Sequence, residues 1–455
     1  MRRNNKIDII NGHVPKVIFK LTYPLVFGVF SIVAFNFTDT YFVSLLGTRA
    51  LTAISFSFPI VIFVGSIALG IGIGAGSLIS RTIGEWSRKR IPLIATNSIL
   101  LALVLAITII WMGLSSMDKI FILLGAAPDI VPYIDTFMKI WFIGAIFFVI
   151  PMVGNNAMRA TGDTILPSLI MILASVLNVI LDPLFIFGLL GFPKMGLEGA
   201  AVATLISRAT ACFACICFLH YRHRMLTVKI PKIKTILITW WKILYVGVPA
   251  AATNIFIPIT LAIITRFASS YGPDAVAAFG AGRRIQALAF MVYLALGAAI
   301  IPFVGQNFGA GRVDRIKSGL KTTYLFSIVY GIIIFILFYL FSEYFAALFS
   351  INKEVIHNIT LYLCIVSIGY GFQGIARTVC QGFNALNKPL YSFLLNFMRF
   401  FLFYVIFSYI GSKYFGLLGL FTGICVANLL SGTIAIILIT IHLKKNTALY
   451  EKQEI

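Results

Sequence analysis

Charged residues are scarce in this chain. They make up 11% of its 455 residues, whereas hydrophobic residues make up 60%. A soluble domain is usually about a quarter charged, so this chain has too few polar side chains to cover a surface that faces water. Lipid must therefore be the solvent for much of the chain, and we expect it in the inner or plasma membrane of the cell.

Alternation of polar and apolar residues is also lacking in the apolar segments. These segments run for about 20 to 30 residues, which suits membrane-spanning helices and excludes a transmembrane barrel. The fold class predicted is an all-α membrane protein with twelve transmembrane helices. The expected spans are 17–42, 51–80, 92–115, 131–156, 165–190, 197–220, 238–268, 277–304, 320–346, 356–382, 389–411 and 416–442.

Motifs for metal or nucleotide chemistry are missing. Cys212, Cys215 and Cys217 lie in one apolar run without the ligand spacing of a zinc site. The segment GIGIGAG at 70–76 lacks the strand and the lysine of a phosphate loop, and its small residues indicate close helix packing instead. We therefore expect no enzyme, no cofactor and no ATP-driven pump.

The net charge of +21 comes from lysines and arginines in short loops between apolar runs. These residues crowd alternate loops, above all 221–242, and are few in the opposite loops. Because cationic loops are retained on the cytoplasmic side, both termini are expected in the cytoplasm. Orientation explains the charge better than a nucleic-acid partner does. The basic, polar start and the long first apolar run do not resemble a cleavable signal.

The two halves of the chain repeat each other with a shift of 225 residues. The repeat predicts two pseudo-symmetric six-helix bundles in parallel orientation, with the substrate region between them. The expected parts are an N-terminal lobe 1–220, a cytoplasmic linker 221–237 and a C-terminal lobe 238–455. Matching residue pairs include Pro24 and Pro249, Gly47 and Gly272, Gly84 and Gly309, and Gly144 and Gly369.

Two carboxylates lie well inside apolar spans of the first half, Asp39 and Asp182. Burying an ionised group in lipid costs about 2.5 kcal/mol or more, so such residues are usually functional. Asn178 precedes Asp182 by one helical turn and shares its face. Together with Thr38 these residues predict an oxygen-rich pocket. The alternative is that each carboxylate only bonds a neighbouring helix.

Such a pocket suits two chemistries. A desolvated carboxylate near a second one can take up a proton, and oxygen ligands can instead hold Na⁺. No other metal is expected. The second half has no carboxylate in the middle of its spans, so the coupling site is expected in the first lobe alone.

Pro24 is expected to kink the helix that carries Asp39, either as a hinge or as a static bend. Arg266 and Arg399 are cations within spans of the second half. They either line a substrate cavity or form hydrogen bonds between helices.

Several segments together resemble the multidrug and toxic compound extrusion (MATE) family over nearly the whole chain: SRTIGEW at 80–86, RATGDTILP at 159–167, GAAVAT at 199–204, VGQNFGAG at 304–311, and NVILDP. The family has two six-helix bundles. Within it, the chain looks like the DinF-type branch. That resemblance implies a cation or proton site at Asp39, Asn178, Asp182 and Thr204, with Pro24 implicated in bending.

The NorM-type branch of the family uses carboxylates in helices seven and ten. This chain has none there, only Gln373 and Gln381 near the latter position. Gln373 therefore joins Thr38, Arg266 and Arg399 as a candidate residue of the substrate cavity.

The leading hypothesis is a secondary antiporter that exports organic, often cationic, compounds in exchange for H⁺ or Na⁺. An alternative is a flippase for a lipid-linked or amphipathic molecule, whose anionic headgroup would suit Arg266 and Arg399. A channel or a non-transporting scaffold is disfavoured by two carboxylates buried in one lobe. The expected partners are a small organic substrate and the lipid bilayer, and a monomer suffices.

Overall fold

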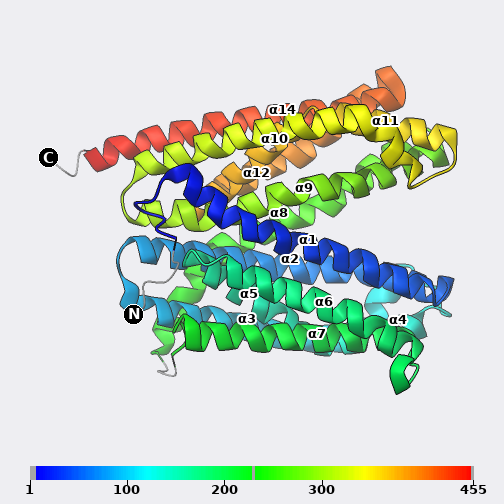
Figure 1. Ribbon diagram of the computed structural model, residues 1–455, viewed down its shortest axis with the longest axis horizontal. Coiled ribbons are helices and arrows are strands. Elements are labelled where there is room, and N and C mark those ends of the chain that lie inside the picture. Colours follow the sequence, from blue (N-terminus) through cyan, green and yellow to red (C-terminus); the bar gives the residue numbers. More distant parts are fainter. Residues whose placement is uncertain (1–6, 228–230, 452–455) are drawn as a thin grey trace. The chain divides into compact units, whose positions relative to one another are not determined.

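The computed structural model describes residues 7–227 and 231–451, and within these ranges the regular structure is entirely helical. Residues 228–230 of the predicted linker lie outside the described residues. Figure 1 shows the α-helices of the described residues and labels all of them except α13. They are α1 (Val14–Ser44), α2 (Thr48–Gly84), α3 (Ile91–Leu123), α4 (Val131–Ile143), α5 (Ala145–Ala160), α6 (Ile165–Phe187), α7 (Leu197–Cys217), α8 (Ile233–Ser269), α9 (Pro273–Gly309), α10 (Val313–Ala347), α11 (Lys353–Ser367), α12 (Tyr370–Ala385), α13 (Pro389–Phe397) and α14 (Ile406–Glu451).

Length and composition allow nine helices of the described residues to cross a membrane, or up to eleven if each bent pair is one span. The longest stretch, Pro389–Lys445, has a non-helical break at Phe415 and Gly416. Beyond the break the chain runs back, because Gly423 lies against the backbone of Phe407. This stretch therefore makes two crossings, which brings the total to the predicted twelve. The all-α membrane fold is confirmed.

The chain forms two compact units, and their boundaries fall inside helices. Of the described residues, the N-terminal unit contains 23–227 and 231–251, and the C-terminal unit contains 7–22 and 252–451. Helices α1 and α8 are thus each shared between the units. In the C-terminal unit, the side chain of Arg315 donates hydrogen bonds to the carbonyl oxygens of Ile9 and Gly12, which ties the first residues to that unit.

The first half of α8 stays with the N-terminal unit, beyond the linker expected at 221–237. Trp240 Nε1 donates to the carbonyl oxygen of Asn97 at 3.0 Å. Helix α8 also packs closely on α2, because Gly74 of α2 has no side chain and leaves room for the carbonyl oxygen of Ile243 in α8. Small residues of GIGIGAG therefore bring helix backbones together, as their spacing predicts.

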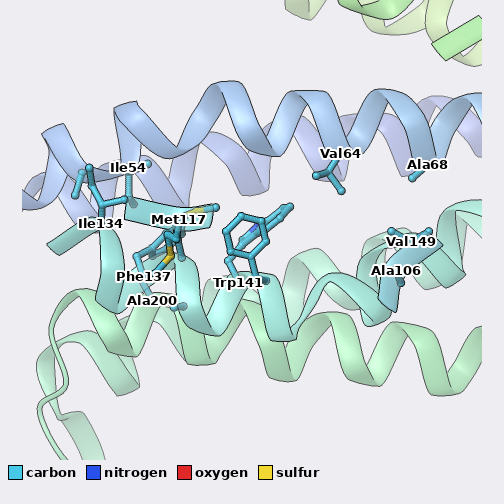
Figure 2. Packing of buried hydrophobic residues seen from close by; sticks show 14 of the residues in the cluster. Ile54, Val64, Ala68, Ala106, Met117, Ile134, Phe137, Trp141, Val149 and Ala200 are labelled. Atoms are coloured by element: carbon cyan, nitrogen blue, oxygen red, sulfur yellow. The ribbon is translucent and has the colours of Figure 1, made fainter. Parts of the chain in front are cut away.

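The core of the N-terminal unit is a cluster of buried apolar side chains from α2, α3, α4, α5 and α7 (Figure 2). Trp141 and Phe137 of α4 are among its largest members, at 4% and 7% exposure. Lipid is as apolar as these side chains, so close van der Waals packing rather than exclusion of water holds such a core together. Outward-facing apolar residues such as Trp111 and Leu123 are exposed, as expected where lipid is the solvent.

The sequence repeat returns as a structural one inside each unit. Gly47 and Gly272 have φ of 101° and 96° and stand directly before α2 and α9. Gly144 separates α4 from α5 at a bend of 46°, and Gly369 separates α11 from α12 at a bend of 54°. Positive φ strains any residue with a Cβ. Glycine at positions 47 and 272 is therefore explained by the backbone conformation that both positions share.

Candidate functional site

Helix α6 carries two of the predicted site residues on one buried face. Asn178 and Asp182 are 1% and 0% exposed. Asn178 Nδ2 donates to Thr204 Oγ1 of α7 at 3.2 Å, so the amide is oriented by the neighbouring helix. Because Asp182 follows Asn178 by four residues, its carboxylate lies one turn away on the same face.

The start of α6 is fixed outside the membrane-spanning part. Asp163 Oδ1 accepts the backbone N–H groups of Ile165 and Leu166, each at 3.1 Å, in the manner of a helix cap. His223 Nε2 lies 3.3 Å from Asp163 Oδ2. Partial burial opposes ionisation of Asp163, but the interaction with His223 and the two N–H groups outweigh burial and hold the pKa of that carboxyl below its usual value.

Asp39 of α1 meets Asp182 in the interior of the N-terminal unit. The two carboxylates are close enough for their charges to interact. Asp39 Oδ1, both oxygens of Asp182 and Asn178 Oδ1 are buried and accept no hydrogen bond within the described part of the chain. Buried acceptors without donors are costly, so this group of oxygens is suited to take up a proton or a small cation.

A cavity of about 170 Å³ opens beside these oxygens, entirely within the N-terminal unit. Asn178 and Thr204 lie in its wall, whereas Asp39 and Asp182 do not. Asn178 therefore stands between the cavity and Asp182, which lies one helical turn further along α6. Its apolar wall includes Phe35, Phe147 and Met152, which suits a flat ring. The remaining residues of the wall are Ile32, Phe148, Pro151, Asn155, Ile170, Met171, Ala174, Ser175, Ser207, Arg208 and Ala211.

Arg208 is a residue of this cavity that the sequence analysis missed. Its guanidinium lies 4.6 Å from the ring centre of Phe148 and 5.6 Å from that of Trp141. It is also close enough to Asp39 for their charges to interact. The signal was present in the sequence, since Arg208 stands one helical turn after Thr204 and so shares its face.

Thr38 is placed differently from the prediction. Its hydroxyl donates to the carbonyl oxygen of Ala34 at 2.9 Å, inside α1, and it is not part of the cavity wall. Pro24 lies within α1, immediately after the boundary between the two units at Thr22 and Tyr23. The residue predicted to bend this helix thus stands where the helix passes from one unit to the other.

Gln373 and Arg399 are buried in the C-terminal unit. Gln373 Oε1 accepts from Gln286 Nε2 at 3.4 Å. Arg399 donates to Asn428 Oδ1 at 3.3 Å and to the hydroxyl of Tyr404 at 3.4 Å. Hydrogen bonding between segments, the second of the two roles considered for Arg399, is therefore present.

Arg266 lies apart from these residues, in an open hollow of the C-terminal unit of about 770 Å³. The hollow is also lined by Lys413 and Tyr271. The predicted residues thus separate into an N-terminal group of Asp39, Asn178, Asp182 and Thr204 and three dispersed positions in the other unit.

Comparison with known proteins finds relatives that align with most of this chain. The MatE family model matches residues 24–184 and 249–410. The chain is 34% identical over 424 residues to the FAD transporter of Shewanella oneidensis, covering 93% of this chain and 94% of that protein. It is 25% identical over 379 residues to the multidrug export protein MepA of Staphylococcus aureus, covering 81% and 83% of the two chains.

A solved structure is also similar. The MATE transporter VcmN of Vibrio cholerae in the bent form matches with a TM-score of 0.91 at 27% identity, over 96% of this chain and 98% of that one. The two segments matched by the family model begin at Pro24 and Pro249. These are the same two prolines that the internal repeat pairs.

Proposed function

Because the chain belongs to the MatE family, whose members are membrane transporters and not enzymes, we propose that it exports small organic compounds in exchange for H⁺ or Na⁺. The observation that carries this proposal is the meeting of Asp39 and Asp182 beside a cavity in the N-terminal unit. A gradient-driven exporter needs a site where the coupling ion binds, and this pair supplies one.

The coupling step follows from the charges. Two ionised carboxylates held close together in a dry interior repel each other and lack donors to offset their burial. Binding one proton or one Na⁺ removes the repulsion. The free oxygens of Asn178 and Asp182 are the ligands that Na⁺ would use, whereas H⁺ needs only one carboxylate oxygen. Both ions therefore remain in the proposal.

The names of the relatives indicate which substrates to test. One is named an FAD transporter and others are named multidrug export or resistance proteins. FAD contains aromatic rings, which the phenylalanines of the cavity suit. We propose an aromatic organic substrate, and the measurement below tests FAD and a fluorescent cation side by side.

A flippase has less support. The flippase hypothesis requires Arg266 and Arg399 to bind an anionic headgroup. Neither residue lies in the cavity wall of the N-terminal unit. Arg399 is already engaged by Tyr404 and Asn428. We further propose a location in the inner or plasma membrane, with both termini in the cytoplasm and the chain acting as a monomer.

Export from proteoliposomes under an imposed pH or Na⁺ gradient tests the function. We expect efflux with one gradient and not with the other, which identifies the ion. Asp39→Asn and Asp182→Asn are each expected to lower the rate of gradient-driven efflux by roughly tenfold or more. Both variants should still accumulate in the membrane. The exposed acid Asp129 provides a control, because Asp129→Asn should leave efflux unchanged. Normal transport by both site variants would refute the coupling proposal.

A further inference from the structure

The wall of the cavity in the N-terminal unit contains one cationic side chain, that of Arg208. It is the one charged side chain in the wall, and the other polar members are asparagines, serines and a threonine. No carboxylate of the described residues forms an ion pair with Arg208, although Asp39 is near enough to interact through its charge. A compound bound in this cavity would therefore lie against a guanidinium.

Arg208 is held in place by rings rather than by acceptors. Its guanidinium carbon lies 4.6 Å from the ring centre of Phe148 and 5.6 Å from the ring centre of Trp141. Such contacts fix the plane of the group and leave its edge free. A guanidinium has five N–H donors, and no hydrogen bond from Arg208 to another described residue uses them. The side chain is thus pre-organised toward an acceptor that this chain does not supply.

We propose that the substrate exported through this unit carries a phosphate-like anionic group beside an aromatic ring, and that Arg208 binds the anion. The inference rests on the export function proposed above. Arginine pairs with phosphate through two parallel hydrogen bonds, which also orient the ligand. The cavity has room for one ring, since an apolar cavity of about 150 Å³ binds benzene. A larger aromatic system such as a flavin would place one of its rings there against Phe35 and Phe147 and extend beyond the cavity.

Arg208 also lies close enough to Asp39 for their charges to interact. Asp39 and the anionic group of the substrate therefore act on the same guanidinium, although the coupling ion and the substrate bind at different groups.

Flavins provide a matched pair of probes, because riboflavin and FMN share their ring system and differ by one phosphate. We would measure quenching of their fluorescence by the purified full chain in detergent, without any gradient. The native chain is expected to bind FMN about tenfold more tightly than riboflavin, the effect of about 1.4 kcal/mol from a charge-assisted hydrogen bond. Arg208→Gln should bring the two affinities together, and Arg208→Lys should keep part of the preference.

Arg377→Gln is the matched control, since Arg377 is a membrane-buried arginine of the C-terminal unit outside this cavity. It should retain the preference for FMN. The proposal is overturned if the native chain does not prefer FMN, if Arg208→Gln retains the preference, or if Arg377→Gln loses it equally. If Arg208→Gln does not fold, Arg208→Lys decides the matter, because a point charge without the planar fork must weaken FMN binding and leave riboflavin binding unchanged.

The two proposals can fail separately. Binding in detergent needs no coupling ion, so a phosphate preference that survives in Asp39→Asn supports the role of Arg208 even if efflux does not depend on Asp39. Conversely, efflux that depends on Asp39, combined with equal binding of FMN and riboflavin, would remove only the anion site. If Arg208 served solely to balance Asp39, Arg208→Gln would leave the ratio of the two affinities unchanged, and that result also overturns the proposal.

Discussion

At the scale of single residues, the N-terminal unit concentrates acceptors that no donor reaches. Oxygens of Asp39, Asn178 and Asp182 are buried there without a hydrogen bond of standard geometry. The amide nitrogen of Asn178, which donates to Thr204, is the donor nearest to Asp182. A structural core would pair such groups, because each unpaired polar atom lowers stability. This arrangement supports the cation site proposed here, and Thr204 holds the amide of Asn178 beside it.

Thr204→Val tests this orienting role. Valine has the shape of threonine without the hydroxyl, so the buried amide of Asn178 loses its acceptor. We expect a loss of stability of about 1–3 kcal/mol, the cost of an unsatisfied buried donor, together with weaker coupling of efflux to the ion gradient. Thermal unfolding in detergent and proteoliposome efflux measure the two effects.

The control is Thr210→Val on the same helix. The hydroxyl of Thr210 is exposed and donates only to the carbonyl oxygen of Ile206 in its own helix. This variant should unfold and transport as the native chain does. Equal stability of both variants would show that the contact between Asn178 and Thr204 contributes nothing.

At the scale of helices, small residues determine which backbones can approach. A Cβ on Gly74 would lie 2.2 Å from the carbonyl oxygen of Ile243 in α8, a distance at which the helices must separate. A Cβ on Gly65 of the same helix would meet only the ring of Phe148, at 3.6 Å. The two glycines of α2 thus serve different purposes.

Gly74→Ala is expected to destabilise the N-terminal unit by about 1–3 kcal/mol through overpacking. Gly65→Ala is its matched counterpart and should be neutral or slightly stabilising, because alanine is the better helix former by about 1 kcal/mol. Thermal unfolding of the two variants in detergent compares them directly. A Gly74→Ala protein as stable as Gly65→Ala would argue against close contact between α2 and α8.

Helices are also the level at which the sequence was most informative. Long apolar runs predict spans well, because every backbone polar group in lipid must be satisfied within the helix. The repeat paired Gly144 with Gly369, and each proves to mark a bend between two helices. It could not show that the ends of α1 and α8 join different units, because that depends on contacts such as those of Arg315 with Ile9 and Gly12.

For the site, periodicity placed Asn178 and Asp182 on one face, and the structure brings Asp39 to them. Thr204 came from the family resemblance rather than from spacing. Arg208 was overlooked because a lone arginine in an apolar run has no partner at helical spacing to draw attention to it. Thr38 was overvalued, since a threonine hydroxyl in a helix commonly bonds its own backbone, as it does here.

At the scale of the whole molecule, α1 passes from one compact unit to the other next to Pro24. Proline removes a hydrogen bond to the preceding turn and weakens the helix there. Any change in the carboxylate pair at Asp39 is carried by the same helix. We interpret Pro24 as the place where α1 bends when the coupling ion binds.

Pro24→Ala restores the missing N–H and stiffens the helix. We expect efflux to fall roughly tenfold with normal membrane accumulation, because the helix bends less readily although the ion site is untouched. Pro59→Ala in α2 is the control, since α2 lies wholly within the N-terminal unit. Efflux measured in proteoliposomes should be close to native for Pro59→Ala, and equal rates for the two variants would mean that Pro24 is only a static bend.

The division of α1 and α8 has a consequence for the origin of the chain. The first helix of each half, α1 or α8, begins in the compact unit formed mainly by the other half. The two halves also share their pattern of glycines and prolines. A free-standing ancestor of a single half would have left that opening segment without neighbours of its own.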